Sequence, residues 1–280
     1  MSEYQYYWFE AIDKPLTPEQ QKALRAISTR AEIDSRRFVN EYNYGDFRGK
    51  PLEMMKKYFD AHIHYACWAT NILMLKVPAK CIDLKLAKQY CTKNTFKIVE
   101  SGKDLIFCFN IWVEDGEGWW DENHEAKQMV VLRDDIFGGD YRSLYLAWLA
   151  RVHDGNYQED DDSTPPPVPA GLGKLTEPLK VFAEFMFLND TDLKEAAKLS
   201  NTDIPKPPSA KEMKDWIAAL PEKIKNEMLL AILDGSETSQ AVHRTLLNRF
   251  REERKKVKQA KTNTICPTKK TCRKKLPKKP

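Results

Sequence analysis

The sequence lacks most of the features that assign a protein to a structural or functional class. No apolar run approaches the roughly 18 residues of a membrane-spanning helix. The start, Met1-Ser2-Glu3-Tyr4, has neither the basic region nor the apolar core of a secretory signal. A composition with 7 Trp, 11 Tyr and 12 Phe also argues against disorder throughout. We therefore expect a folded cytoplasmic protein without a membrane span.

The six cysteines show neither a disulfide nor a zinc pattern. They lie at positions 67, 81, 91, 108, 266 and 272, and no two of them form a Cys-x-x-Cys pair. Without a secretory signal, an even number of cysteines does not indicate a disulfide framework, and zinc sites need closely spaced ligand pairs. We expect the first four to be free and mostly buried thiols.

Familiar catalytic motifs are absent as well. The sequence contains no Gly-x-Ser-x-Gly, no Gly-x-x-x-x-Gly-Lys-Ser/Thr and no Gly-x-Gly-x-x-Gly. Gly171-x-Gly173 follows a proline-rich segment rather than a strand, and adjacent carboxylates such as Asp134-Asp135 are typical of solvated faces. The sequence therefore predicts no cofactor and favours a non-catalytic protein. An active site that matches none of these motifs stays an alternative.

The net charge of +4 averages two opposed segments. Residues 251–280 carry 13 Lys and Arg against two Glu, a net charge of +11, which leaves −7 on residues 1–250. The chain is an acidic body with a basic carboxy-terminal segment, so its overall charge says little about partners.

The first half of the chain has a mixed strand and helix pattern. Residues 3–11 are apolar at nearly every position, which predicts a strand covered on both faces. Thr17, Pro18 and Gln20 form a helix start with a capping box. The segments 96–100 and 105–113 flank a turn and predict a hairpin. Further strands are expected at 38–44 and 129–132, and short helices after Pro51 and over 83–90. The segments 64–68 and 72–77 form either two strands, which we favour, or one continued buried helix.

The second half is predicted to be helical. Residues 141–152 carry a complete apolar stripe, and a proline-rich segment with acidic residues 159–162 follows. Ser209 with Glu212 forms a second capping box, and Pro221 opens the next helix. The sequence thus predicts an α+β fold in which a mixed strand and helix domain (1–153), a linker (154–173), a small all-α domain (174–258) and a disordered basic tail (259–280) follow one another.

Two places suggest a ligand site. His62-x-His64 would point both imidazoles to one face of a strand, as a chelating pair requires, with a third ligand from Asp121, Glu122 or His124. The competing interpretation places both rings on a helix end or a half-exposed strand with no metal, and we expect no metal site. In the loop 116–124, Trp119, Trp120, Asp121 and His124 would suit a sugar, a base or a cationic peptide, unless the Trp pair folds back onto the core.

The basic segment is a candidate for nonspecific polyanion binding through counterion release. Its candidate residues are Arg251, Arg254, Lys255, Lys256, Lys258, Lys269, Lys270, Arg273, Lys274 and Lys275. The same charges would suit anionic lipid or the acidic residues 159–162, or would simply keep a disordered terminus in solution. Because no aromatic residue follows Phe250, base-specific single-strand recognition is disfavoured.

Several short sequence segments are similar to those of a protein family. They are Ser2-Glu3-Tyr4-Gln5-Tyr6-Tyr7, Phe38-Val39-Asn40-Glu41-Tyr42, Tyr58-Phe59-Asp60-Ala61, Leu144-Tyr145-Leu146-Ala147-Trp148-Leu149 and Pro167-Val168-Pro169-Ala170-Gly171-Leu172-Gly173. Over residues 2–250 the chain resembles a family of uncharacterised bacterial proteins. The resemblance implies no activity, cofactor or catalytic residue. It also implies a long charged helical extension, from which this chain departs after about residue 258.

These observations favour a cytoplasmic interaction or accessory protein whose partner is another protein. Two alternatives stay open. One is nonspecific nucleic-acid binding through the basic segment, and the other is a metal-dependent enzyme that uses the loop 116–124 together with His62 and His64.

Overall fold

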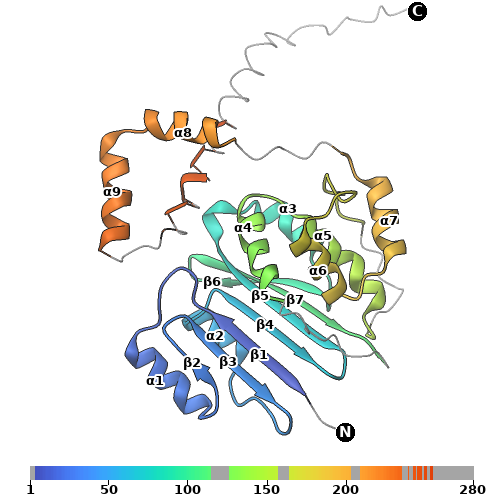
Figure 1. Cartoon of the computed structure of the whole chain (residues 1–280). Helices are drawn as coiled ribbons and strands as arrows, with labels where there is room; N and C mark the ends of the chain where they lie inside the picture. The colour runs from blue at the N-terminus through green and yellow to red at the C-terminus, as the bar shows by residue number, and fades with distance from the viewer. Residues whose placement is uncertain are drawn as a thin grey trace, which may run out of the picture.

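The computed structural model describes residues 4–114, 126–156, 164–202 and 209–234, together with 239, 242–243, 245–247, 249–250 and 253–254. Its described part contains one seven-stranded antiparallel sheet in the order β2-β3-β1-β4-β5-β7-β6 (Figure 1). The strands are β1 Gln5–Glu10, β2 Glu32–Ile33, β3 Arg37–Tyr42, β4 Ala61–Ala66, β5 Thr70–Pro78, β6 Phe96–Ser101 and β7 Asp104–Trp112. The predicted α+β class is confirmed.

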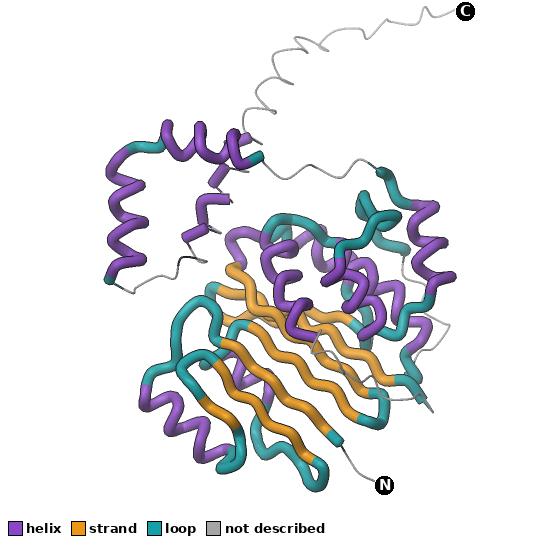
Figure 2. The backbone as a smooth tube through the Cα atoms, viewed as in Figure 1, coloured by secondary structure: helices purple, strands orange, loops and turns teal. Residues whose placement is uncertain are grey.

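Helices cover both faces of this sheet (Figure 2). The α-helices are α1 Pro18–Ile27, α2 Pro51–Lys57, α3 Leu84–Ala87, α4 Leu132–Phe137, α5 Arg142–Leu149, α6 Glu177–Phe185, α7 Asp190–Leu199, α8 Ala210–Ala219 and α9 Glu222–Leu233. Short 3-10 helices are η1 Ala79–Cys81, η2 Lys88–Tyr90, η3 Ala126–Val131 and η4 Ala150–His153. Both predicted capping boxes form, at Thr17 and at Ser209. No helix among the described residues is long and apolar enough to cross a bilayer.

The sheet separates two apolar cores. Tyr6 and Trp8 of β1 point into the larger core, which α4, α5 and α6 cover, whereas Tyr7 and Phe9 point into a smaller core under α1 and α2. All residues of β1 except Glu10 are therefore buried, which confirms the prediction of a strand covered on both faces.

Residues 129–132 do not form the predicted strand. They belong to η3 and the start of α4, where Met129, Leu132 and Ile136 are buried at spacings of three and four residues. Val131 is instead half exposed. The positions of this segment that pack on the sheet have the helical period rather than the alternation of a strand.

The body of the molecule extends beyond the segment predicted as a linker. Leu179, Phe182 and Phe185 of α6 are buried in the larger core, and the ring of Phe182 meets that of Phe109 on β7 edge to face at 5.1 Å. Tyr90 donates its hydroxyl hydrogen to the carbonyl of Pro167 at 2.9 Å. Residues assigned to the helical domain thus divide: α6 covers the sheet and Ala196 of α7 is buried in the same core, whereas α8 and α9 lie apart from the sheet in Figure 1.

Gly49 lies close to the ring of Phe47, which belongs to an aromatic cluster. The ring of Phe47 covers Tyr7 at a centroid distance of 4.5 Å and also contacts Phe9, Phe38 and Tyr42. A Cβ atom on Gly49 would lie 2.4 Å from Cζ of Phe47, so the ring would have to move out of this cluster.

Gly49→Ala is therefore expected to lower the free energy of unfolding by about 1–3 kcal/mol, as overpacking typically does. Urea denaturation measures this value. Gly173→Ala is the matched control, because its new Cβ would meet only the Cβ of Ala197 at 3.8 Å, an ordinary contact. Equal stabilities of the two variants would contradict the prediction that a Cβ atom at position 49 displaces the ring of Phe47 from the aromatic cluster.

Candidate interaction surface

Most of the ligand-binding residues expected from the sequence lie outside the described part of the chain. This is true of Trp119, Trp120, Asp121 and His124 in the aromatic loop. It is also true of the basic residues Arg251, Lys255, Lys256, Lys258, Lys269, Lys270, Arg273, Lys274 and Lys275. Ligand binding by the loop therefore stays a prediction, and so does polyanion binding by the basic segment.

Arg254, the described member of the basic set, contacts other residues of the chain. Its guanidinium forms an ion pair with Glu212 of α8 and lies 4.8 Å from the ring centroid of Phe250. Phe250 in turn meets Trp216 edge to face at 5.3 Å. Hydrogen bonds from Ser209 and Arg254 hold the pKa of Glu212 below its usual value. Arg254 thus holds the carboxy-terminal helical segment against α8.

The two candidate metal-binding histidines are buried in the sheet. His62 and His64 on β4 are 0% and 5% exposed, so the expected half-exposed strand or helix end is wrong. Each Nδ1–H donates a hydrogen bond of 3.0 Å to a backbone carbonyl of β1, that of Trp8 for His62 and that of Tyr6 for His64. Burial lowers the pKa of His62 to about 3 and that of His64 to about 4.

Both histidine rings pack against aromatic rings of β1. His62 stacks on Phe9 at 3.9 Å, and His64 lies 4.2 Å from the ring of Tyr7. Among the described residues no group of three or more His, Cys, Asp or Glu side chains is arranged to hold a metal ion. The geometry of the pair is thus that of neutral aromatic rings in a core, with one polar edge bonded to the neighbouring strand.

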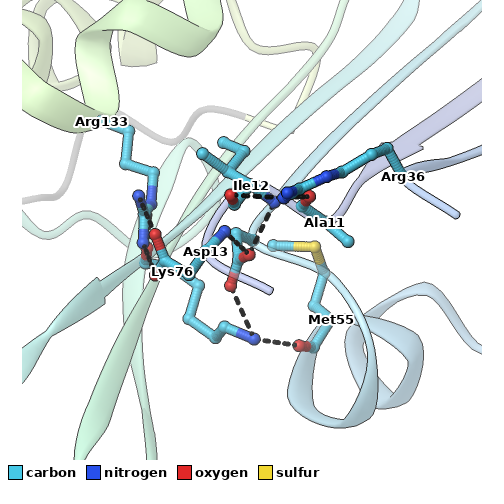
Figure 3. Close-up of polar contacts among 8 residues, drawn as sticks. Ala11, Ile12, Asp13, Arg36, Met55, Lys76 and Arg133 are labelled. Atoms are coloured by element: carbon cyan, nitrogen blue, oxygen red, sulfur yellow. Dashed lines mark hydrogen bonds and ion pairs between the residues drawn. The ribbon is translucent and has the colours of Figure 1, made fainter. Parts of the chain in front are cut away.

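A buried ion cluster that sequence patterns do not indicate lies at one end of the sheet (Figure 3). One carboxylate oxygen of Asp60 accepts the backbone N–H groups of Ile12 and Asp13, each at 2.8 Å. Its other oxygen lies 3.0 Å from Nζ of Lys76, which also donates to the carbonyl of Met55. Asp60 thereby joins the end of β1, α2 and β5.

Two arginines extend this cluster. Arg133 of α4 binds Asp13 with both terminal nitrogens and donates from Nε to the carbonyl of Lys76, while Arg36 donates to the carbonyls of Ala11 and Ile12. Because each charge meets an opposite charge or a backbone group, the arrangement is a structural clamp. No sequence motif could reveal it, since its members lie far apart along the chain.

The exposed surface with the clearest chemical character lies on α9, a helix without a buried residue. Ile224, Met228 and Ala231, spaced four and three residues apart, form its half-buried side. On the other side four aliphatic side chains are in contact with solvent: Leu229 is 58% exposed, Leu230 60%, Ile232 38% and Leu233 82%. We call these four residues the α9 patch.

The sequence predicts this helix but not the patch. Residues 228–233 are all apolar, so their pattern does not show which side of the helix is covered. Comparison with protein-family models, with curated proteins and with solved structures finds no match for the chain. The family resemblance therefore stays an expectation.

Proposed function

We propose that this chain is a non-catalytic cytoplasmic interaction protein, in which the sheet body carries a small helical unit that binds another protein through the α9 patch. The observation that carries the proposal is the exposure of four large aliphatic side chains within five consecutive residues of one helix. A single exposed leucine, such as Leu199 on α7, needs no explanation. Four contiguous ones are typical of a surface that a partner covers.

The energetics support a protein partner. Covering one aliphatic side chain fully contributes about 1.5–3 kcal/mol, so covering the exposed parts of the α9 patch would supply favourable interaction energy that offsets part of the cost of association. The patch is flanked by charged residues of the same helix, among them Lys223 and Glu227, and this is the usual arrangement of an apolar centre with a polar rim.

Site-specific photo-crosslinking in cells tests this proposal with the full chain. A benzoylphenylalanine at position 230 is expected to give one dominant protein adduct, whereas the same group at position 199, also exposed but alone on α7, gives only background. The adduct at 230 must disappear when Leu233→Asp is added to the same chain. Crosslinking that is equal at both positions, or insensitive to Leu233→Asp, would contradict the proposal.

A further inference from the structure

We infer that a row of exposed lysines along the β6 edge of the sheet binds the phosphate backbone of double-stranded nucleic acid, without regard to base sequence. The row, which we call the lysine edge, consists of Lys80, Lys85, Lys88, Lys93, Lys97 and Lys103, all of them exposed. It shares no residue with the basic carboxy-terminal segment or with the α9 patch, so the inference goes beyond the proposed function.

Backbone contacts place three of these lysines at the two ends of β6. The N–H of Ala79 donates to the carbonyl of Lys103 at 2.9 Å, so η1 with Lys80 lies beside the turn that follows β6. At the other end, the N–H of Thr92 donates to the carbonyl of the first residue of β6, also at 2.9 Å. Lys93 therefore lies where the strand begins.

The other three lysines lie beside or within this strand. Nζ of Lys88 in η2 is 3.5 Å from a carboxylate oxygen of Glu100 on β6. Lys85 lies three residues earlier on α3, which η2 continues, so both side chains are on the same side of this helical stretch. Lys97 belongs to β6 itself, which is the last strand of the sheet. A lysine in an edge strand also discourages strand pairing, but that purpose does not account for the five lysines outside β6.

The lysine edge is basic although the body of the chain is acidic. Residues 79–103 carry six lysines against Asp83 and Glu100, a net charge of +4. The remainder of residues 1–250 carries 26 basic against 37 acidic groups, a net charge of −11. Asp83 accepts the N–H of Leu86 as a helix cap, and Glu100 pairs with Lys88. The edge thus presents a local positive field, which attracts an anionic partner.

The lysine edge lacks the apolar centre of a protein interface. Among the described residues from 69 to 130, no large hydrophobic side chain is exposed. Ile82, Leu84 and Leu86, which lie between the lysines along the chain, pack against the larger core. Protein partners are usually held by a buried apolar centre with a polar rim, whereas a polyphosphate is held by charge alone. The surface therefore fits a polyphosphate better than a protein.

The residue types favour a duplex that is bound without base recognition. Residues 79–103 contain no Arg, whose planar fork suits bidentate contacts with guanine. Their two aromatic residues, Tyr90 and Phe96, are buried and cannot stack on the bases of a single strand. A six-residue strand is roughly 20 Å long, and this length of duplex carries about twelve phosphate charges. A row of lysines along β6 can follow such a backbone.

Fluorescence anisotropy with a labelled DNA duplex measures this binding with the full chain. In the triple variant Lys85→Gln, Lys88→Gln and Lys93→Gln, the affinity at about 0.1 M salt should fall at least about tenfold. The slope of the logarithm of the affinity against the logarithm of the salt concentration should decrease by about two to three, because each lost phosphate contact contributes about 0.9. Two duplexes of unrelated sequence should bind with the same affinity.

Lysines of α6 and α7 supply the matched control. Lys180, Lys194 and Lys198 are exposed, and Lys180 has an ion-pair partner, Glu177 at 2.6 Å, just as Lys88 does. Changing these three lysines to Gln lowers the net charge by the same amount and should leave the affinity and the slope near those of the unmodified chain. Equal losses in both triple variants would show that only net charge matters, and would overturn the lysine edge as a site.

Acetylation of lysine side chains, read by mass spectrometry, locates the contact without any substitution. Bound duplex DNA should lower the acetylation rate of Lys85, Lys88 and Lys93 but not that of Lys194 and Lys198. Protection confined to the lysines after residue 254 would assign all binding to the basic segment and would overturn the inference.

Two further outcomes would replace the nucleic acid by another occupant. Vesicles with anionic lipid that protect the lysine edge, when duplex DNA does not, would point to a membrane surface. Slow acetylation of the edge before any DNA is added would show that another part of the chain, such as the acidic residues 159–162, covers it. Either outcome would overturn the inference and leave the proposed function of the α9 patch standing.

Discussion

Asp60→Ala is expected to lower the free energy of unfolding by about 3–5 kcal/mol, since removing one partner of a buried ion pair leaves the other charge uncompensated. The side chains of Asp60 and Lys76 are only 8% and 14% exposed. The substitution also removes the acceptor of the Ile12 and Asp13 backbone N–H groups, both of which bond to Asp60 at 2.8 Å. Urea denaturation followed by circular dichroism measures the loss.

A surface ion pair supplies the control for Asp60→Ala. Glu53 and Lys56 lie 2.8 Å apart on α2, with side chains 48% and 32% exposed, and such a pair contributes only about 0–1 kcal/mol. Glu53→Ala should therefore have little effect on the free energy of unfolding. If the two variants lost the same stability, the cluster around Asp60 would not be the clamp that its geometry indicates.

The two buried histidines are expected to make the folded state sensitive to acid. The pKa of His62 is about 3 and that of His64 about 4 in the folded chain, against about 6.5 for an unfolded histidine. Below pH 6.5 the unfolded chain binds protons that the folded chain does not. The contribution of the two neutral histidines to the free energy of unfolding is thus complete above pH 6.5. It is lost as the pH falls toward 4 and then 3. Each histidine contributes up to about 1.4 kcal/mol per pH unit.

Urea denaturation between pH 7 and pH 5 isolates this effect, because carboxylates titrate mainly at lower pH. The double variant His62→Phe with His64→Phe keeps flat aromatic rings beside Phe9 and Tyr7 but carries no titrating group. Its stability should vary much less with pH over this range. His243→Asn alters an exposed histidine and serves as the control. An unchanged slope in the double variant would show that other groups cause the acid sensitivity.

Local signals in the sequence predict most elements of the fold. The capping boxes at Thr17 and Ser209, the hairpin of β6 and β7 and the two-faced strand β1 all form as expected, because each depends on residues a few positions apart. Two segments differ from the expectation: the short strand β2, Glu32–Ile33, was not predicted, and 129–132 is not a strand. In the second segment, packing on the sheet selects the helical spacing of Met129, Leu132 and Ile136.

The sites are less predictable than the elements. His62 and His64 have the spacing of a chelating pair, yet the carbonyls of β1 accept their Nδ1–H groups. No local sequence pattern indicates the clamp. Its members Asp13, Asp60, Lys76 and Arg133 come into contact only when β1, β4, β5 and α4 assemble. Exposure of the α9 patch likewise depends on which side of an evenly apolar helix its neighbours cover.

The sequence by itself therefore determined the α+β class, the helix starts and turns, and the division into an acidic body and a basic segment. These features follow from periodicity, capping and charge counts, which are properties of neighbouring residues. Only the tertiary structure decided that His62 and His64 are core residues, that Asp60 anchors a buried ion cluster and that α9 exposes four aliphatic side chains. Burial and long-range pairing depend on which distant segments meet, and neighbouring residues do not encode that information.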